Sequence, residues 1–219
     1  MMVKVKLTYF VDVLSSWCLI AENALDRVRN EFGDQLDYEW RIASLRDELD
    51  YTREMLEFYY RRTKAVTGTM LNSVWLDGRA DGPKWADLAA EAARGLGCID
   101  DRVRLALARG AMEDGLHMSK RDVCVETASK AGGLKTADLE RAMDDPQTAA
   151  RIKASSDAFA AYNVPVRPTF VVSNSIADVY VLSGCWRYEL LAQTIRDAIS
   201  DAGVYAKFMS ENKAPAGVV

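Results

Sequence analysis

Histidine is almost absent from this sequence: His117 is the one histidine among 219 residues. It lies in the segment EDGLHMSKRD, at a predicted helix junction, where we expect a structural role. One histidine leaves no plausible Ser-His-Asp arrangement, and the scattered thiols add no metal-ligand spacing, so we expect no metal site. A glycine-rich phosphate loop is also missing, which removes the commonest sequence signal for nucleotides.

Cysteine is scarce as well. The four cysteines, Cys18, Cys98, Cys124 and Cys185, lie far apart and form no C-x-x-C pair. They are too few for a disulfide scaffold, so we expect free thiols in a reducing compartment. The start, MMVKVKLTYFVDV, lacks the apolar core of a secretory signal, and no window approaches the roughly 18 apolar residues of a membrane span. We therefore expect a cytoplasmic protein with no membrane partner.

The sequence also has no excess of positive charge. Lysine and arginine number 28 against 32 acidic residues, which gives a net charge of -4. Proteins that neutralise a nucleic-acid backbone need clustered basic residues, so we expect no nucleic-acid partner. With 49% hydrophobic and 27% charged residues, the chain can bury one good core, as one globular unit or as one with a large insertion.

The first part of the chain predicts a strand-helix-strand unit. Residues 3–13 and 36–43 are rich in β-branched and aromatic residues, which is typical of strands. Between them Ser15 or Ser16 offers a helix N-cap, apolar residues follow at helical spacing, and Gly33 ends the helix. Two strands joined in this way should be parallel.

The middle of the chain is helical in pattern and its last part returns to strands. Residues 168–172 and 179–184 predict a hairpin, and a final helix is predicted over 186–199. The helices predicted in the middle cover 47–66, 83–96, 99–113, 119–131, 136–143 and 146–162.

This order predicts an α/β fold in which two sheet-forming halves close around a helical insertion, because the first half has too few strands to be stable alone. We expect residues 1–45 and 163–202 to form the sheet domain, 46–162 an inserted helical domain, and 203–219 a C-terminal tail. Ligands of such sheets bind beyond the carboxyl ends of parallel strands, near a helix N-terminus. The segment VDVLSSWC lies there.

These features together resemble the DsbA-like branch of the thioredoxin superfamily: the βαβ and ββα halves, the motif DVLSSWC at the first strand-helix turn, and VPVRPTFVV before the third strand. The resemblance covers nearly the whole chain and implies a thioredoxin-like fold with a large all-helical insertion. In this branch, thiol-disulfide oxidoreductases carry C-x-x-C at the first turn. Kappa-class glutathione transferases and 2-hydroxychromene-2-carboxylate isomerases carry serine in the first position instead. Residues 12–15 match the second group, whereas Ser16 replaces its usual proline and Cys18 its usual serine.

Ser15 is the first candidate catalytic residue. By the resemblance the attacking sulfur belongs at position 15, and a hydroxyl there leaves no two-cysteine redox cycle at this motif. A hydroxyl beside a helix N-terminus stabilises an anion, including the thiolate of bound glutathione, so Ser15 would hold this cofactor. The alternative is an ordinary N-cap. Cys18, also a catalytic candidate, is either a small buried hydrophobe or a monothiol that forms mixed disulfides.

The loop before the third strand supplies two more candidates. In thioredoxin-like proteins this proline is cis, and the backbone of the residue before it pairs with the substrate or with glutathione. The resemblance therefore predicts a cis Pro168, with Arg167 as the presenting residue in a glutathione site. The Arg167 side chain either reaches a ligand carboxylate or is solvated on a loop.

The segment LSGCWRYELL matches the last strand-to-helix turn of the kappa-class enzymes, which reads Gly-Ser-Asp-Arg. Gly184 and Arg187 match, but Cys185 and Trp186 replace the Ser and Asp that bind the γ-glutamyl end of glutathione. Backbone amides at Gly184 and Cys185 would still donate to a bound cofactor. Cys185 is either an unusually acidic thiol at a helix N-terminus or buried packing. We expect Trp17 and Trp186 to line a substrate pocket.

Three functions are compatible with these residues. The first is a glutathione-dependent transferase or isomerase acting on a small electrophile, with aromatic compounds among the candidates. The second is a monothiol oxidoreductase acting through Cys18 or Cys185. The third is a redox-inactive thioredoxin-fold binding protein. A homodimer is consistent with the family. The segment at 57–70, EFYYRRTKAVTGTM, either lines a pocket for an aromatic acid or forms a basic helix face in water.

Overall fold

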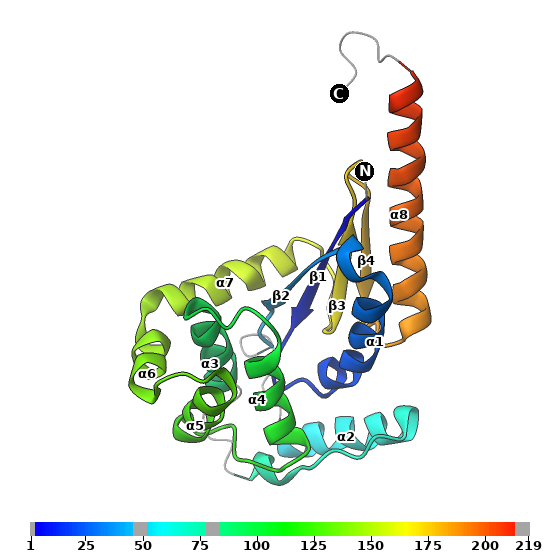
Figure 1. Cartoon of the computed structure of the whole chain (residues 1–219). Helices are drawn as coiled ribbons and strands as arrows, with labels where there is room; N and C mark the ends of the chain where they lie inside the picture. Colours follow the sequence, from blue (N-terminus) through cyan, green and yellow to red (C-terminus); the bar gives the residue numbers. More distant parts are fainter. Residues whose placement is uncertain (1–2, 46–51, 78–83, 213–219) are drawn as a thin grey trace.

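A mixed sheet with the strand order β2-β1-β3-β4 forms the centre of the computed structural model, which describes residues 3–45, 52–77 and 84–212 (Figure 1). β1 pairs in parallel with β2 and antiparallel with β3, and β3 pairs antiparallel with β4. The strands are β1 (Val5–Val11), β2 (Leu36–Ile42), β3 (Thr169–Ser173) and β4 (Val179–Ser183). The predicted parallel unit and the predicted hairpin are both confirmed.

Helices make up most of the remaining chain. They are α1 (Ser16–Phe32), α2 (Arg53–Thr67), α3 (Lys84–Gly95), α4 (Arg102–Met112), α5 (Arg121–Gly132), α6 (Thr136–Asp144), α7 (Pro146–Ala160) and α8 (Tyr188–Glu211), with 3-10 turns at Gly33–Gln35 and Val74–Leu76. The helices predicted between 46 and 162 correspond in order to α2 through α7. Residues 47–51 of the first of them, and residue 83 at the start of the second, lie outside the described residues.

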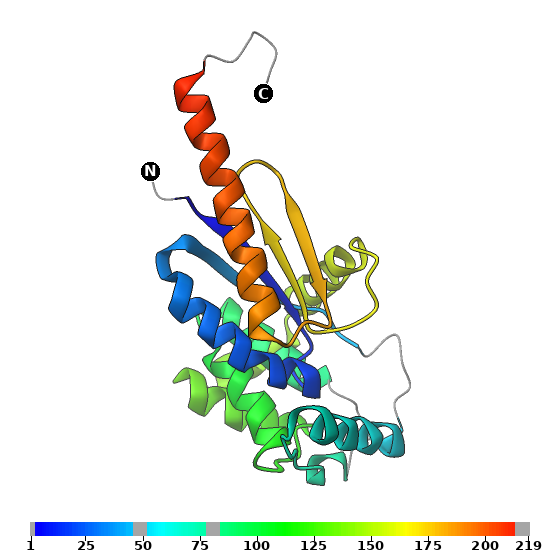
Figure 2. The ribbon, with the colours of Figure 1, turned by 90° about the vertical axis from the view of Figure 1, so that its right-hand side faces the viewer.

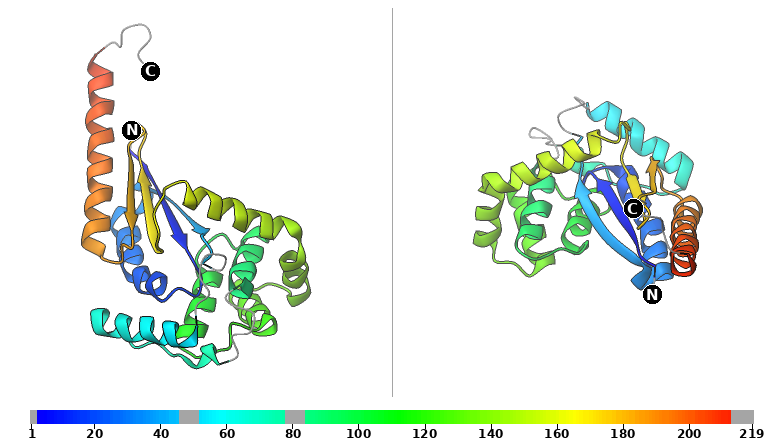
Figure 3. Two further views of the ribbon diagram at one scale, coloured as in Figure 1. Left: turned by 180° about the vertical axis from the view of Figure 1, so that it is seen from behind. Right: turned by 90° about the horizontal axis from the view of Figure 1, so that it is seen from above.

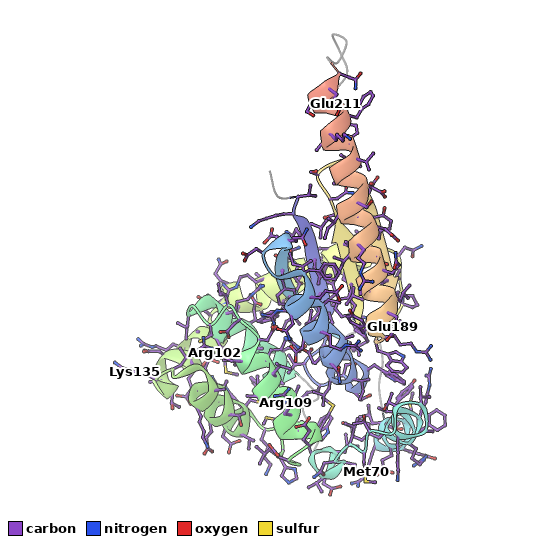
Figure 4. The ribbon with its side chains drawn as sticks, turned by 45° about the vertical axis from the view of Figure 1, so that its right-hand side comes forward. Met70, Arg102, Arg109, Lys135, Glu189 and Glu211 are labelled. Atoms are coloured by element: carbon purple, nitrogen blue, oxygen red, sulfur yellow. The ribbon has the colours of Figure 1, made fainter. Side chains whose placement is uncertain are left out.

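The predicted end of the last helix is wrong. α8 continues past residue 199, through residues assigned to a tail, as far as Glu211. Residues 200–211 contain no proline and one glycine, and Lys207 pairs with Glu211 at helical spacing, so nothing in this segment stops the helix. Figure 4 marks Glu189 and Glu211 near the two ends of α8 and shows that its last turns project beyond the sheet.

Two helices cover one face of the sheet. Side chains of β1 alternate between the faces, and Leu7 and Tyr9, on the first face, are fully buried. The Tyr9 ring stacks on Phe170 of β3, with 4.6 Å between the centroids. Figure 2 shows α1 and α8 side by side over this face. Their buried residues, among them Leu25, Val28, Leu191 and Ile195, complete the main core.

The second face packs against the end of α7. Phe10 of β1 contacts Phe159 of α7, with 5.5 Å between the ring centroids, and Val171 of β3 joins the same small core. Helices α3 to α6 gather on the β2 side of the sheet, whereas α2 lies apart from them, near α1 (Figure 3). The sheet is therefore buried on both faces near its centre, and the start of α1 remains at one end of it.

A buried ionic cluster joins the helical segment to α1. The Arg104 guanidinium of α4 donates to Glu22 of α1, Nη1 to Oε1 at 2.6 Å and Nη2 to Oε2 at 3.0 Å. It also donates to Asp101 Oδ1 at 2.7 Å. The three residues are at most 6% exposed. Because water is excluded, each charge depends on its partners for solvation.

None of the helices in the described ranges is long and apolar enough to cross a membrane.

Replacing Arg104 should test this cluster. We expect Arg104→Met to lower the free energy of unfolding by about 3–5 kcal/mol, because it leaves the Glu22 carboxylate buried without its cation, whereas Asp101 keeps Arg29. Arg102→Met is the control, since Arg102 pairs with Asp100 at the surface and exposed pairs contribute little. Urea unfolding followed by circular dichroism measures both. Equal effects of the two substitutions would contradict a structural role for the cluster.

Candidate active site

Ser15 lies at the start of α1, directly after the turn that ends β1. Its backbone is extended (φ -80°, ψ 121°), and its Oγ accepts a hydrogen bond from the Cys18 amide at 3.4 Å. The Ser15 amide donates to the Asp12 carbonyl at 3.1 Å. Ser15 is therefore the N-cap of α1. Because its oxygen accepts this bond, the hydroxyl hydrogen is still a donor for a ligand.

The buried Asp12 side chain stabilises the turn before Ser15 by accepting hydrogen bonds from the backbone. This residue is 2% exposed, and its carboxylate accepts from the Leu14 amide at 3.1 Å and from the Leu45 amide at 2.9 Å. The second bond ties the turn to the end of β2. The sequence motif contained Asp12 but gave it no role, because a bond to an amide 33 positions away has no local sequence signal.

The Cys18 thiol is buried beneath the Ser15 hydroxyl. The side chain is 1% exposed, and Tyr9 donates its hydroxyl to the Cys18 carbonyl at 3.0 Å. Burial raises the pKa of Cys18 to about 12, although hydrogen bonds from Ser15, the Asp12 backbone and Tyr9 oppose this shift. A thiol with this pKa is protonated at neutral pH and is a poor nucleophile.

The loop before β3 contains the predicted cis peptide bond, between Arg167 and Pro168. The alternative of a solvated Arg167 side chain is wrong. The residue is 5% exposed, and its guanidinium donates to the carbonyls of Ala43 at 2.8 Å and Ser44 at 3.1 Å. It also stacks on Phe159, 4.2 Å from the ring centroid. The carbonyls after β2 need donors in a buried place, and Arg167 supplies them.

The turn before α8 lies against this loop. The Gly184 amide donates to the Pro168 carbonyl at 2.7 Å. Gly184 has a φ of 69°, and a Cβ there would lie 3.3 Å from Val166, so both its backbone conformation and the close approach favour glycine. Two segments predicted to hold the cofactor, the cis-proline loop and the last turn, are thus joined directly.

Cys185 is not an acidic thiol, which corrects one of the two alternatives. It is 6% exposed, and burial raises its pKa, opposed by a hydrogen bond from the backbone of Arg187. Its Sγ lies 3.7 Å from the Arg187 carbonyl. Desolvation outweighs the favourable field of the helix N-terminus, so the alternative of buried packing is confirmed.

The two tryptophans predicted at the pocket meet in the structure. Trp17 of α1 and Trp186, just before α8, are half-buried, with 6.0 Å between their ring centroids. Arg62 of α2 lies over Trp17 at 5.4 Å, and Arg187 over Trp186 at 5.0 Å. The pair therefore forms an aromatic surface flanked by two positive charges. No local sequence signal pairs Arg62 with Trp17, because α2 contacts α1 only in the folded protein.

Two further observations limit the site. A hollow of about 560 Å³ lies at the other end of α1, lined by Asp26, Arg29, Asn30, Gly33, Leu36 and Tyr38, and contains none of the predicted site residues. Within the described ranges, no group of three or more His, Cys, Asp or Glu side chains is arranged to hold a metal ion.

Known structures share this architecture. Cytosolic disulfide reductase DsbM from Pseudomonas aeruginosa has a TM-score of 0.63 at 22% identity, with 93% of this chain and 99% of that chain covered. A Nitrosomonas europaea protein assigned as a protein disulfide isomerase has a TM-score of 0.70 at 15% identity, covering 93% and 98%. A 2-hydroxychromene-2-carboxylate isomerase has a TM-score of 0.64 at 12% identity, covering 91% and 98%. At these identities the likeness establishes the fold alone.

No curated protein matches the sequence. The model of one family does: the DSBA-like thioredoxin domain matches residues 6–196. With the βαβ and ββα halves, the intervening helices and the cis-proline loop all in place, the chain belongs to this family of thioredoxin-like proteins.

Proposed function

We propose that this protein binds glutathione at the Ser15 turn and uses its sulfur to convert a small electrophile, as a transferase or an isomerase. The observation that carries this proposal is the position of the Ser15 hydroxyl. It caps α1 at the end of β1, where the oxidoreductases of the family have their attacking sulfur. A thiol that arrives with a cofactor would receive the hydrogen bond there.

The chemistry of this position favours a thiolate. Free thiols have a pKa of about 8.5, and a hydroxyl donor at a helix N-terminus lowers the pKa of a sulfur bound beside it. The thiolate then adds to an electrophilic carbon of the substrate. A transferase releases the adduct, whereas an isomerase breaks the new carbon-sulfur bond after the substrate has rearranged.

The surroundings of Ser15 support a small ligand. The Pro168 loop and the Gly184 turn, which the family uses to hold glutathione, are bonded to each other. Trp17 and Trp186 supply an apolar surface for the substrate. The positions of Cys185 and Trp186 offer no carboxylate for the glutamyl ammonium, so backbone groups would hold that end of the cofactor.

One structural relative supports the same class of ligand: DsbM of Pseudomonas aeruginosa, 22% identical, has been solved with GSH. The 2-hydroxychromene-2-carboxylate isomerase supports an isomerase as one form of the proposed activity. We also propose a cytoplasmic location, where glutathione is abundant and thiols stay reduced. A homodimer is proposed as well.

Calorimetric titration of the reduced protein with glutathione tests the proposal. We expect saturable binding, and we expect Ser15→Ala to weaken it about tenfold, because one hydrogen bond to a charged sulfur is lost. Ser15→Ala also removes the helix cap, at a cost of about 1 kcal/mol of stability. No binding at millimolar glutathione would refute the proposal.

Two variants separate capping from binding. Ser15→Asp keeps the capping acceptor but places a negative charge beside the sulfur, so it should keep the stability and lose the binding. Ser16→Ala changes the neighbouring serine and should change neither. If Ser15→Asp binds glutathione as well as the wild type does, the hydroxyl is only a cap.

A second candidate, monothiol exchange through Cys18, has one observation in its favour. The Cys18 sulfur lies within hydrogen-bonding reach of the Ser15 hydroxyl, at the centre of the site. Its burial and its pKa of about 12 count against it.

Alkylation with iodoacetamide at pH 8 tests whether the Cys18 thiol is reactive in the native protein. We expect Cys18 to stay unmodified in the native protein and to react in urea, because roughly one thiol in 10⁴ is ionised at this pH in the fold. Mass spectrometry of tryptic peptides measures the modification at each cysteine. Rapid labelling of native Cys18 would favour the monothiol mechanism.

Ser15→Cys should create a disulfide-exchange site. The substitution places a second sulfur above Cys18 at the C-x-x-C spacing, so the two can form a disulfide while an added disulfide, such as glutathione disulfide, is reduced to two thiols. We expect this variant, and not the wild type, to consume glutathione disulfide stoichiometrically with loss of two protein thiols. Equal consumption by the wild type would mean that Ser15 does not exclude disulfide chemistry.

A further inference from the structure

Asp87 is a buried carboxylate that connects the helical segment to the Ser15 turn. It belongs to α3 and is fully buried. Its Oδ1 accepts a hydrogen bond from the Val13 amide at 3.2 Å, and its Oδ2 accepts one from the Ser44 hydroxyl at 2.8 Å. One side chain from the helices thus holds the active-site turn and the end of β2 together.

Ser44 is the point at which the parts of the site converge. Its carbonyl accepts from the Arg167 guanidinium at 3.1 Å, and its amide donates to Ser156 of α7 at 3.3 Å. Arg167 directly precedes the cis Pro168. The path Val13, Asp87, Ser44, Arg167 therefore connects the turn that presents Ser15 with the cis-proline loop through three hydrogen bonds.

The amides of Val13, Leu14 and Ser15 are all bonded, and of these three bonds the one from Val13 reaches outside the turn. The Leu14 amide donates to the Asp12 side chain and the Ser15 amide to the Asp12 carbonyl. The Val13 amide donates to Asp87. Loss of the Asp87 acceptor would free the segment two residues before Ser15, in a buried place where water cannot replace the bond.

We infer that Asp87 is a positioning residue for the Ser15 hydroxyl: it acts through Val13 and Ser44 and touches no ligand. The inference rests on the proposed function, because the binding that it improves is that of the thiol at Ser15. It adds a role for the helical segment, which contributes through Asp87 to the geometry of a site formed on the sheet.

The test compares two buried carboxylates of α3. Asp87→Leu keeps the approximate volume and removes both acceptors. Glu91→Met is the control, because Glu91 is 1% exposed on the same helix but its partners are Arg94 and Arg151. Asp87→Asn keeps one acceptor and is the conservative rescue. Glutathione affinity is measured by calorimetry on the folded fraction of each variant.

We expect Asp87→Leu to lower the glutathione affinity only when Ser15 is present. Asp87→Leu should weaken binding about tenfold, and Asp87→Asn by no more than about threefold. In a Ser15→Ala background, Asp87→Leu should weaken binding no further, because both changes remove the same hydrogen bond to the ligand. Glu91→Met should lower the stability and leave the affinity unchanged. An unchanged affinity in Asp87→Leu, or an equal loss in both backgrounds, would overturn the inference.

A second measurement keeps the two proposals distinguishable. If the wild type binds no glutathione, the proposed function fails, and amide hydrogen exchange then tests the positioning directly. Asp87→Leu, or Ser44→Ala if Asp87→Leu does not fold, should speed exchange at Val13 and Leu14 at least tenfold relative to Leu7 in β1. Glu91→Met should not. Exchange that stays as slow as in the wild type would overturn the inference independently of any ligand.

Discussion

The structure depends on the position of β1 between two strands that are far apart in the chain. β1 bonds in parallel to β2, which follows α1, and antiparallel to β3, which follows the whole helical segment. Neither half forms a sheet of useful size alone. Closing this long connection costs chain entropy, and the burial of Leu7, Tyr9 and Phe10 on the two faces of β1 offsets that cost. The site follows from this arrangement, because the turn after β1 carries Ser15 to the same end of the sheet as Pro168.

Much of this arrangement was predictable from the sequence, and the reasons are local. Alternating or continuous apolar residues indicated each strand, and Ser15 and Gly33 marked the ends of α1. The family resemblance led to the cis Pro168, whereas the contact between Trp17 and Trp186, both expected at the substrate pocket, was first seen in the structure. The end of α8 was missed because the residues from 200 to 212 are mostly exposed, with Ala202 alone buried among them, so no apolar face indicated that the helix continues.

The sequence did not predict which individual polar side chains are buried. Arg167 was predicted to lie on a loop, yet its side chain is buried, where it stacks on Phe159 and donates hydrogen bonds to the carbonyls after β2. Cys185 stands just before α8, where a helix field favours a thiolate, yet desolvation reverses the sign of its pKa shift. Asp87 sits among alanines in α3 and has no motif. Each outcome depends on which segment lies opposite, and that is fixed by contacts distant in sequence.

The burial of the thiols would protect the protein in the proposed reaction. All four cysteines are free and buried, and burial raises the pKa of Cys18, Cys124 and Cys185. An enzyme that concentrates a reactive electrophile exposes its own nucleophiles to it at every turnover. In the proposed reaction the reactive thiolate would be carried by the cofactor, and the buried protein sulfurs would be shielded from the electrophile, so the catalyst would be spared self-inactivation.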